Sequence, residues 1–223
     1  RGWTAEENRH GDLLNKYLYL SGRVNMQEFE RSTQYLIADG FNIETGQDPY
    51  RNFFYTSFQE LATNISHRRV ATMAKQQGDS LLSKINGVIA ADEMRHAKAY
   101  MSFIKKIFEY DPNEVLIAFE DMMRKKIVMP AHFLRETGMD VGGLWGHFTD
   151  AAQRIGVYTA VDYANILKEL VLEWNLANLC SLNEAGEKSR DYLVKLPDRL
   201  LKISERMPNP VNEYEFKWIG VRN

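Results

Sequence analysis

The amino-acid sequence predicts an all-α protein on three observations. Proline is scarce, at 6 of 223 residues, and almost every proline stands at the edge of an expected element. No segment shows the strict alternation of apolar and polar residues that marks a half-buried β-strand. Helix-start signals recur instead, and between them apolar residues return every three or four positions. A chain of this length is expected to form a single domain over residues 1–223.

Three helix-start signals precede the helices expected in the first half of the chain. Asn25 with Glu28 forms a capping pair, because the Asn side chain can accept from first-turn amides while the Glu side chain reaches back. Asp48 followed by Pro49 gives an N-cap and a first helical residue. The segment 111–114, Asp-Pro-Asn-Glu, combines both signals.

Three stripes of residues at helical spacing predict long helices in the same half of the chain. The stripes consist of Glu7, His10, Leu14 and Tyr17; of Phe53, Thr56, Glu60, Thr63 and His67; and of Ile85, Ile89, Glu93, His96, Tyr100, Phe103 and Ile107.

Further helices are expected in the second half of the chain. Thr159 with Asp162, and Ser181 with Glu184, are the start signals for two of them. The final segment, from Tyr214 to Val221, is aromatic and is expected to be extended. The expected helices cover about 112–129, 143–155, 160–180, 183–195 and 197–206.

Composition excludes several classes of protein. The net charge of −2 gives no electrostatic case for nucleic-acid binding, which calls for a basic face. The single cysteine, Cys180, can form neither an internal disulfide nor a thiolate metal cluster. No run of 18 or more apolar residues is present, so no membrane span is expected.

Two Glu-x-x-His pairs interrupt the helical stripes. Glu7 and His10 lie one turn apart and project from one helix face, and Glu93 and His96 repeat the arrangement. The second pair lies within an apolar stripe, where a bare carboxylate and imidazole would be costly to bury. Coordination of iron, manganese or zinc would offset that cost. One such pair is more often a solvated helix face, but two pairs among five histidines favour a metal site.

Glu60 is a further carboxylate inside an apolar stripe. Two Glu-x-x-His helices, with one Glu from each of two other helices, are the ligand set of ferritin-like di-iron carboxylate bundles. The sequence therefore predicts a ferritin-like helical bundle with additional C-terminal helices. Glu60 stands one helix before the Glu93 pair. In the other half of the bundle, the glutamate that corresponds to Glu60 would stand one helix before the Glu7 pair, and therefore upstream of Arg1. We expect residues 1–223 to be the C-terminal portion of a longer protein, with the N-terminal part of the bundle outside this sequence.

Several long motifs closely resemble the soluble acyl-[acyl-carrier-protein] desaturases. The first is Trp-Thr-Ala-Glu-Glu-Asn-Arg-His at residues 3–10, which continues to Gly22. The resemblance extends over essentially the whole chain. The other matching segments are 55–60, 91–96, 121–132, 152–159 and 216–219.

The resemblance implies a di-iron centre, with two Fe ions held by residues of this chain. Asp92 matches an aspartate that hydrogen-bonds a ligand histidine, and Thr63 matches a hydroxyl residue beside the oxygen-binding position. Thr63 could instead only bond back to the preceding helical turn. The implied bridging ligands are Glu7 and Glu93, and the other implied ligands in this chain are His10, Glu60 and His96.

The family reaction is O2-dependent insertion of a cis double bond into a saturated acyl chain in fatty acid biosynthesis. The implied partners are the acyl-carrier-protein substrate, ferredoxin as electron donor and a second copy of the chain in a homodimer. Residues 61–69 differ from the plant pattern, which favours a bacterial, cytoplasmic protein; a plant member would lie in the plastid stroma.

Three other functions remain open from the sequence. A ferritin-like iron-handling protein would use the same ligands, although the roughly 120 residues after His96 argue against it. A radical-generating reductase subunit or a hydroxylase would share the ligand pattern, and the former needs a tyrosine close to the irons. A non-catalytic paralogue would bind acyl carrier protein only.

Overall fold

The structure is a computed structural model that describes residues 2–208, 210–211 and 213–219. These residues contain eight α-helices and two short 3-10 helices, and their β structure is one isolated bridge between Val24 and Ile219. The predicted all-α fold is confirmed for this part of the chain. The elements in order are α1 (Gly2–Ser21), α2 (Met26–Asp39), α3 (Pro49–Gln76), α4 (Ser80–Phe108), α5 (Pro112–Lys125), η1 (Pro130–Phe133), α6 (Trp145–Ile155), α7 (Ala160–Glu173), η2 (Leu176–Asn178) and α8 (Glu184–Ser204).

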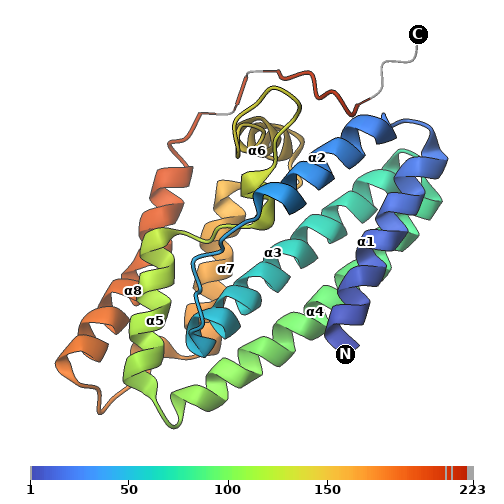
Figure 1. Cartoon of the computed structure of the whole chain (residues 1–223). Coiled ribbons are helices and arrows are strands. Elements are labelled where there is room, and N and C mark those ends of the chain that lie inside the picture. The colour runs from blue at the N-terminus through green and yellow to red at the C-terminus, as the bar shows by residue number, and fades with distance from the viewer. Residues whose placement is uncertain (1, 209, 212, 220–223) are drawn as a thin grey trace.

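Helices α3 and α4 are the longest and pack along each other (Figure 1). Asp48 caps α3 by accepting from the amides of Tyr50 and Arg51, as the sequence predicts. Gly78, with φ of +79°, makes the tight turn before α4, and Asp79 then accepts from the Leu82 amide at 3.0 Å. Helix α1 lies against α4, while α5 and α7 pack on α3 and in turn carry α8.

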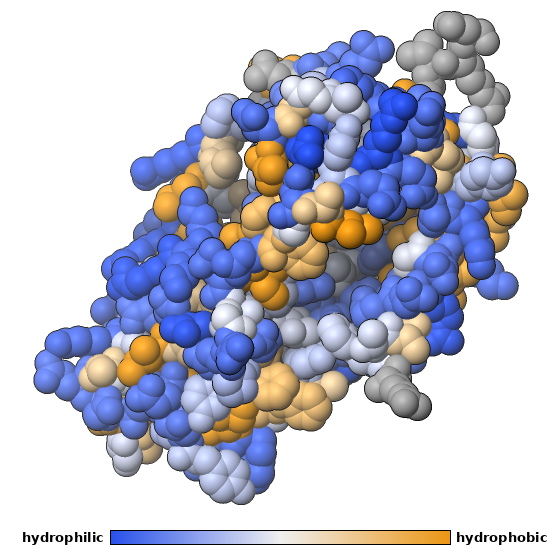
Figure 2. All heavy atoms as spheres, viewed as in Figure 1, coloured by the Kyte–Doolittle hydropathy of each residue, from blue (hydrophilic) through white to orange (hydrophobic). Residues whose placement is uncertain are grey.

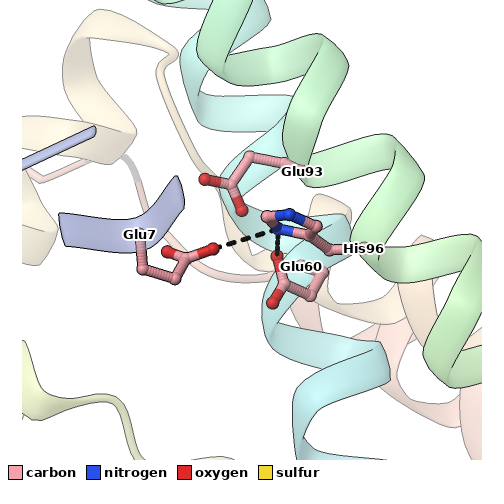
Figure 3. A group of neighbouring side chains, drawn as sticks. All are labelled: Glu7, Glu60, Glu93 and His96. Carbon is pink, nitrogen blue, oxygen red and sulfur yellow. Dashed lines mark ion pairs between the residues drawn. The ribbon is translucent and has the colours of Figure 1, made fainter. Parts of the chain in front are cut away.

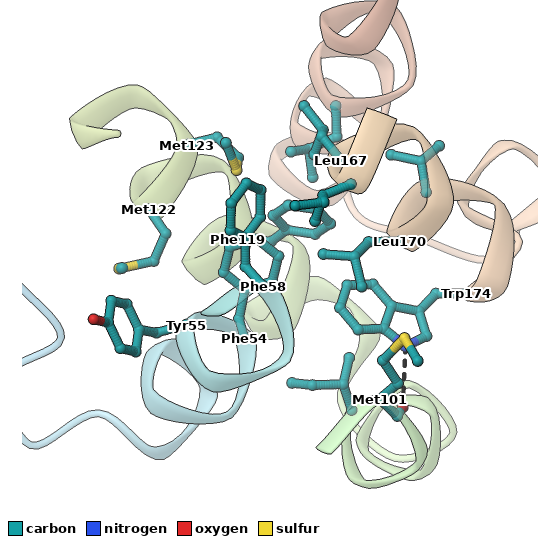
Figure 4. Close-up of a cluster of buried hydrophobic side chains, with 14 of the residues drawn as sticks. Phe54, Tyr55, Phe58, Met101, Phe119, Met122, Met123, Leu167, Leu170 and Trp174 are labelled. Atoms are coloured by element: carbon teal, nitrogen blue, oxygen red, sulfur yellow. Dashed lines mark hydrogen bonds between the residues drawn. The ribbon is translucent and has the colours of Figure 1, made fainter. Parts of the chain in front are cut away.

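The apolar core lies where α3, α4, α5 and α7 meet (Figure 4). The Phe54 and Phe119 rings lie 3.9 Å apart between centroids, and the Trp174 ring packs against both. The Trp174 indole N–H donates to the Met101 carbonyl at 3.0 Å, so its polar atom is satisfied inside the core. This core holds α3 and α4 against α5 and α7, while α1 lies against α4 outside the core.

The start of α7 is tied directly to α3. Thr159 and Asp162 form the predicted capping box, with the Thr hydroxyl accepting from the Asp162 amide and the Asp carboxylate accepting from the Thr159 amide. The same carboxylate accepts from the Arg69 guanidinium on α3, at 2.6 Å from Nη2. This half-buried bidentate pair holds the C-terminal helices in register with α3.

Other predicted helix starts gave mixed results. Asn25 caps α2 as predicted, by accepting from the Glu28 amide, but the Glu28 side chain accepts from Arg31 and does not reach back to Asn25. Pro112 begins α5 as predicted, but the Asp111 side chain makes no cap bond and instead accepts from the Tyr50 hydroxyl at 2.8 Å. The Ser181 start is wrong, because Ser181 has φ of +59° and Asn183 caps α8.

Three predicted helix boundaries were also wrong. The helix expected over 112–129 ends at Lys125, since Lys126 has φ of +66°. The helix expected over 160–180 ends at Glu173, and Asn175, with φ of +51°, turns the chain into η2. The expected break between 195 and 197 is absent, and α8 continues through Pro197. A proline removes one helical hydrogen bond, but Pro197 is buried together with Leu193 and Leu196, and this packing offsets the loss.

The C-terminal segment, expected to be extended, contains a turn at residues 217 and 218, where the Ile219 amide donates to the Phe216 carbonyl at 3.1 Å; residues 220 and 221 of that expectation lie outside the described residues. It is anchored on the buried Glu136 carboxylate, which accepts from the Tyr214 hydroxyl at 2.6 Å and the Lys217 amide at 2.8 Å. The Asn25 amide donates to the Trp218 carbonyl at 2.8 Å. The segment thereby reaches the chain just ahead of α2 (Figure 1).

The surface is mostly hydrophilic on the face drawn in Figure 2, with apolar residues gathered near its middle. Ile37 and Phe41, at the end of α2 and just after it, are among the exposed apolar side chains. Within the described residues, every helix is too short or too polar to cross a membrane.

Candidate metal centre

Helices α1, α3 and α4 bring four of the predicted ligands together (Figure 3). One donor atom each from Glu7, Glu60, Glu93 and His96 lies within 4.8 Å of the others. Glu60, Glu93 and His96 are 1%, 3% and 7% exposed, and Glu7 is partly buried. Three carboxylates so close together in a buried place repel one another unless protons or a cation neutralise them.

His10, the fifth predicted ligand, joins the same cluster from α1. It is the buried residue of that helix, and its Nδ1 lies 3.1 Å from Glu93 Oε1. On the other side, His96 Nδ1 lies 3.0 Å from Glu7 Oε1 and 3.3 Å from Glu60 Oε2. Both imidazoles therefore turn the same ring nitrogen towards the carboxylates.

Three buried atoms at this point lie 3.0–3.1 Å from an opposing ligand atom but form no hydrogen bond with it or with any other described group. They are His10 Nδ1, His96 Nδ1 and Glu7 Oε1. Buried polar atoms are normally satisfied, so such a group needs an explanation. Imidazole nitrogens and carboxylate oxygens that converge without hydrogen bonds are the donor set that a divalent transition metal takes. The buried atoms without hydrogen bonds therefore fit the binding of a metal ion at this site.

The outer nitrogens of both histidines are bound by carboxylates from the opposite helix. His10 Nε2 donates to Asp92 Oδ2 on α4 at 3.1 Å, in the place where the sequence predicts Asp92. His96 Nε2 donates to Glu6 Oε2 on α1 at 2.7 Å. A proton held on Nε2 leaves the Nδ1 lone pair free for a metal ion.

The sequence prediction missed Glu6, although the chain carries a signal for it. Residues 6–10 read Glu-Glu-Asn-Arg-His and residues 92–96 read Asp-Glu-Met-Arg-His. The repeated unit is therefore acid-Glu-x-Arg-His, and Glu6 occupies the position of Asp92. The sequence prediction also missed Trp3, whose indole N–H donates to Glu60 Oε1 at 3.0 Å.

Thr63 lies inside the cluster. Its hydroxyl is 2.7 Å from Glu93 Oε2 and 3.1 Å from the carbonyls of Gln59 and Glu60. One hydroxyl proton can serve one acceptor at a time, and the carboxylate is both the nearest and the most strongly accepting of the three. Both expectations for Thr63, a contact at the site and a bond back to the helix, thus have a geometric basis.

The carboxylates inside the cluster, Glu7 and Glu60, differ in their affinity for protons from the outer pair, Glu6 and Asp92. Burial, and then the hydrogen bond with Glu93, raises the pKa of Glu60 to about 9. Burial and the charge of Glu93 also raise the pKa of Glu7. Burial of Asp92 works in the same direction, but hydrogen bonds from His10 and Arg95 hold its pKa below the usual value, and the bond with His96 lowers the pKa of Glu6. The outer pair is anionic at neutral pH, while Glu60 keeps a proton until a cation replaces it.

Metal-free protein is expected to lose stability through Glu60 as pH rises between about 6 and 8. The native pKa of Glu60 stands above its ordinary value of 4.5, so the native state keeps a proton that the unfolded state has released. One such proton lowers the free energy of unfolding by about 1.4 kcal/mol per pH unit. The measurement is urea unfolding, in the presence of a chelator, at several pH values.

The Glu60→Gln variant isolates this effect, because it keeps the shape of the side chain and removes its titration. Its stability should fall less steeply with pH than that of the wild type. Glu30→Gln, at an exposed position of α2, is the matched control and should keep the wild-type slope. Equal slopes for the wild type and Glu60→Gln would contradict the prediction.

The comparisons with known proteins agree with this geometry. A family model described as fatty acid desaturase matches residues 1–220. The chain belongs to the fatty acid desaturase family. This desaturase-family chain is 52% identical to stearoyl-[acyl-carrier-protein] 9-desaturase 1, chloroplastic, of Arabidopsis thaliana, over 98% of its own length and 56% of the relative's.

Two further relatives show the same extent of similarity to this desaturase-family chain. Stearoyl-[acyl-carrier-protein] 9-desaturase, chloroplastic, of Ricinus communis is 52% identical over 98% of the chain and 56% of the relative. Palmitoyl-[acyl-carrier-protein] 4-desaturase 3, chloroplastic, of Ophrys sphegodes is 51% identical over 100% of the chain and 56% of the relative. The chain thus spans a little over half the length of the curated relatives that it matches.

Proposed function

We propose that this chain is part of an O2-dependent acyl-[acyl-carrier-protein] desaturase that introduces a cis double bond into a saturated acyl chain. The observation that carries the proposal is the convergence of His10 Nδ1, His96 Nδ1 and Glu7 Oε1, all buried and without hydrogen bonds, on buried carboxylates. The names of the relatives supply the substrate class.

The proposed cofactor is a pair of iron ions. Glu7 lies 3.8 Å from His10 Nδ1 and 3.0 Å from His96 Nδ1, and Glu93 lies 3.1 Å from His10 Nδ1, so both would suit the bridging positions that the family resemblance implies. Each half of such a bundle repeats the same ligand pattern, and this repeat supports a sixth ligand, a glutamate on a further helix that is not in this sequence. The ligands in this chain would be Glu7, His10, Glu60, Glu93 and His96.

An iron pair held here would supply the O2-dependent oxidising power needed to remove hydrogen from unactivated C–H bonds, which side chains cannot do alone. The protein contributes orientation and exclusion of water. Asp92 holds the proton on His10 Nε2 and so keeps Nδ1 directed inward. The ring of Tyr100 packs against those of Trp3 and Phe53 beside Glu60, and this apolar layer covers the site in part, with Trp3 itself 40% exposed.

The proposed partners are the acyl carrier protein that presents the substrate, ferredoxin as the source of two electrons, and a second copy of the protein in a homodimer. The proposed compartment follows the host, which is the cytoplasm for a bacterium and the plastid stroma for a plant. The reaction would belong to fatty acid biosynthesis.

The test is an assay of the full-length protein, loaded with iron, with acyl carrier protein carrying chains of defined length, ferredoxin, its reductase and O2. Mass spectrometry of the released acyl chain should find a single cis double bond at one position. Intact bound iron without an alkene from any chain would contradict the proposal. That result would favour the iron-handling or the non-catalytic carrier-binding alternative.

Removal of the Thr63 hydroxyl is expected to slow the proposed reaction while leaving the metal bound. Thr63→Val keeps the side-chain shape but loses the bond to Glu93 Oε2. A hydrogen bond to a charged group that contributes about 1.5–3 kcal/mol corresponds to a loss of roughly tenfold or more in kcat.

Steady-state kinetics and bound-iron content would check this prediction, with Thr63→Ser as the control because it keeps the hydroxyl. Wild-type kcat in Thr63→Val would show that the hydroxyl serves only the helix.

A further inference from the structure

Helix α2 lies outside the apolar core of the molecule. The core formed by the described residues includes no side chain of α2, and Phe29 and Leu36 on this helix are only partly buried. The buried residue of α2 is Ser32, whose hydroxyl has no hydrogen-bond partner among the described residues. A buried hydroxyl without a partner disfavours the packed position of the helix. Elements with few buried apolar contacts open at a lower free energy than the rest of a protein.

The connections on both sides of α2 contain residues that permit a hinge. Gly22, just before the helix, has φ of +61°, and Gly40, directly after it, has φ of +71°. The connection that follows contains two more residues with positive φ, Glu44 at +63° and Gly46 at +58°. Hinges consist of a few residues at the ends of an element that absorb a change in backbone angles, and glycine adopts many such angles without strain. Helix α2 can therefore rotate as one unit about its two ends.

One arginine holds the C-terminal end of α2. The Arg135 guanidinium donates to both carboxylate oxygens of Asp39, the last residue of the helix, at 2.5 Å from Nε and 3.1 Å from Nη2. It also lies 4.0 Å from the centre of the Tyr35 ring, whose hydroxyl is 3.3 Å from the Thr137 hydroxyl. The hydrogen bonds from Arg135 lower the pKa of Asp39, so the pair is charged at neutral pH. A single substitution at Arg135 removes the ion pair and the ring contact together.

The same connection between η1 and α6 also holds the other end of α2. The buried Glu136 carboxylate accepts from the Lys217 amide, and the Lys217 ammonium donates to the Thr137 carbonyl at 2.6 Å. The next residue, Trp218, accepts through its carbonyl from the Asn25 amide, directly before α2. Both ends of the helix are therefore bound to this connection, one directly and one through the C-terminal segment that it anchors.

We propose that α2 is a hinged lid, held closed by the Arg135–Asp39 pair, that opens to admit an apolar chain to the interior. The connection at the released end supplies an apolar route inward. Phe41 is 54% exposed and its ring lies 6.5 Å from that of Phe133, whereas Ile43, two residues later, packs against the core. A chain that enters here passes from the surface to the core in apolar contact. For the identity of the chain this inference rests on the proposed function, which makes it the saturated acyl group of the substrate.

The first test is hydrogen–deuterium exchange of the full-length protein, measured by mass spectrometry on peptides that cover α2. Arg135→Gln removes the charged pair and should speed exchange in residues 26–39 about tenfold or more, because a hydrogen bond between charged groups shifts an opening equilibrium by that factor. Ser32→Ala removes the unpaired hydroxyl and should slow exchange in the same peptides. Peptides from α4 and α5 should exchange at wild-type rates in both variants.

Two controls separate opening of the lid from other effects. Gln34→Ala, on the exposed face of α2, tests whether alanine slows exchange through helix propensity alone, and it should leave the rates unchanged. Arg124→Gln removes an exposed ion pair with Glu120 on α5 and should also leave α2 unchanged. Asp39→Asn should act in the same direction as Arg135→Gln, and it replaces that variant if Arg135→Gln does not fold.

The second test follows the uptake of cis-parinaric acid, a fatty acid whose fluorescence rises in apolar surroundings, by stopped-flow mixing with the full-length protein. A chain that enters only while α2 is open associates in proportion to the open population. The association rate should therefore rise in Arg135→Gln and fall in Ser32→Ala, in step with the exchange rates.

The outcomes distinguish this inference from the proposed function, because neither measurement requires iron, ferredoxin or turnover. Wild-type exchange of α2 in both Arg135→Gln and Asp39→Asn overturns the lid. Altered exchange with wild-type association rates, or wild-type protein that takes up no parinaric acid, overturns the entrance for an apolar chain. Exchange and uptake that change as expected, in a protein that forms no alkene, support the lid and contradict the proposed function alone.

Discussion

Replacement of Glu93 with alanine is expected to abolish both iron binding and the proposed desaturase activity. Glu93 is 3% exposed and stands at the middle of the cluster, 3.1 Å from His10 Nδ1 and 2.7 Å from the Thr63 hydroxyl. Its loss removes the carboxylate that faces the α1 histidine. Bound iron, measured after desalting, should fall from two ions per chain to fewer than one, and no alkene should form.

The same change should not unfold the metal-free protein. Burial of carboxylates that repel one another costs free energy, so the removal of one relieves a penalty while the metal is absent. Urea unfolding with a chelator should find Glu93→Ala about as stable as the wild type. Glu109→Ala, at the exposed end of the same helix, is the matched control and should keep both iron and activity. Full iron content in Glu93→Ala would show that the cluster does not hold the metal.

Replacement of Trp174 with alanine is expected to have the largest effect on stability. Trp174 is 4% exposed, packs against Phe54 and Phe119, and donates to the Met101 carbonyl. Truncation of a large buried aromatic residue leaves a cavity and typically costs about 3–5 kcal/mol. Trp174→Ala should lower the free energy of unfolding by that amount, measured by urea denaturation.

Two further variants separate the contributions of Trp174. Trp174→Phe keeps most of the apolar contact but loses the indole hydrogen bond to the Met101 carbonyl, which still accepts within α4, and should cost about 0.5–1.5 kcal/mol. Leu172→Ala, at a position 69% exposed on α7, should change stability by less than about 0.5 kcal/mol. A cost for Trp174→Ala as small as that for Leu172→Ala would contradict the assignment of the core.

The sequence predicted the long helices and the cluster for a local reason. Glu7 with His10, and Glu93 with His96, each share a helix face, and their conflict with the apolar stripes is visible along the chain. The sequence did not predict the contact of Glu6 because its partner is on another helix. Its contact depends on how α1 is rotated against α4, and the spacing within α1 alone does not define that rotation.

Helix ends were harder to predict where tertiary packing overrides local preference. Lys126 and Asn175 adopt positive φ angles that their residue types do not require, and only Asn175 is in the left-handed helical conformation. Pro197 reads as a helix breaker, yet the burial of α8 against its neighbours carries the helix through it.

The bridge between Val24 and Ile219 joins the connection between α1 and α2 to the aromatic C-terminal segment. Nearly all of the sequence lies between its partners, so the entropy lost on closing that loop is among the largest in the molecule. Contacts of this kind form late in folding, after the local helix pairs have assembled. The last step of folding would therefore be the placement of the aromatic C-terminal segment, and the same contact would be the first to open when the native protein fluctuates.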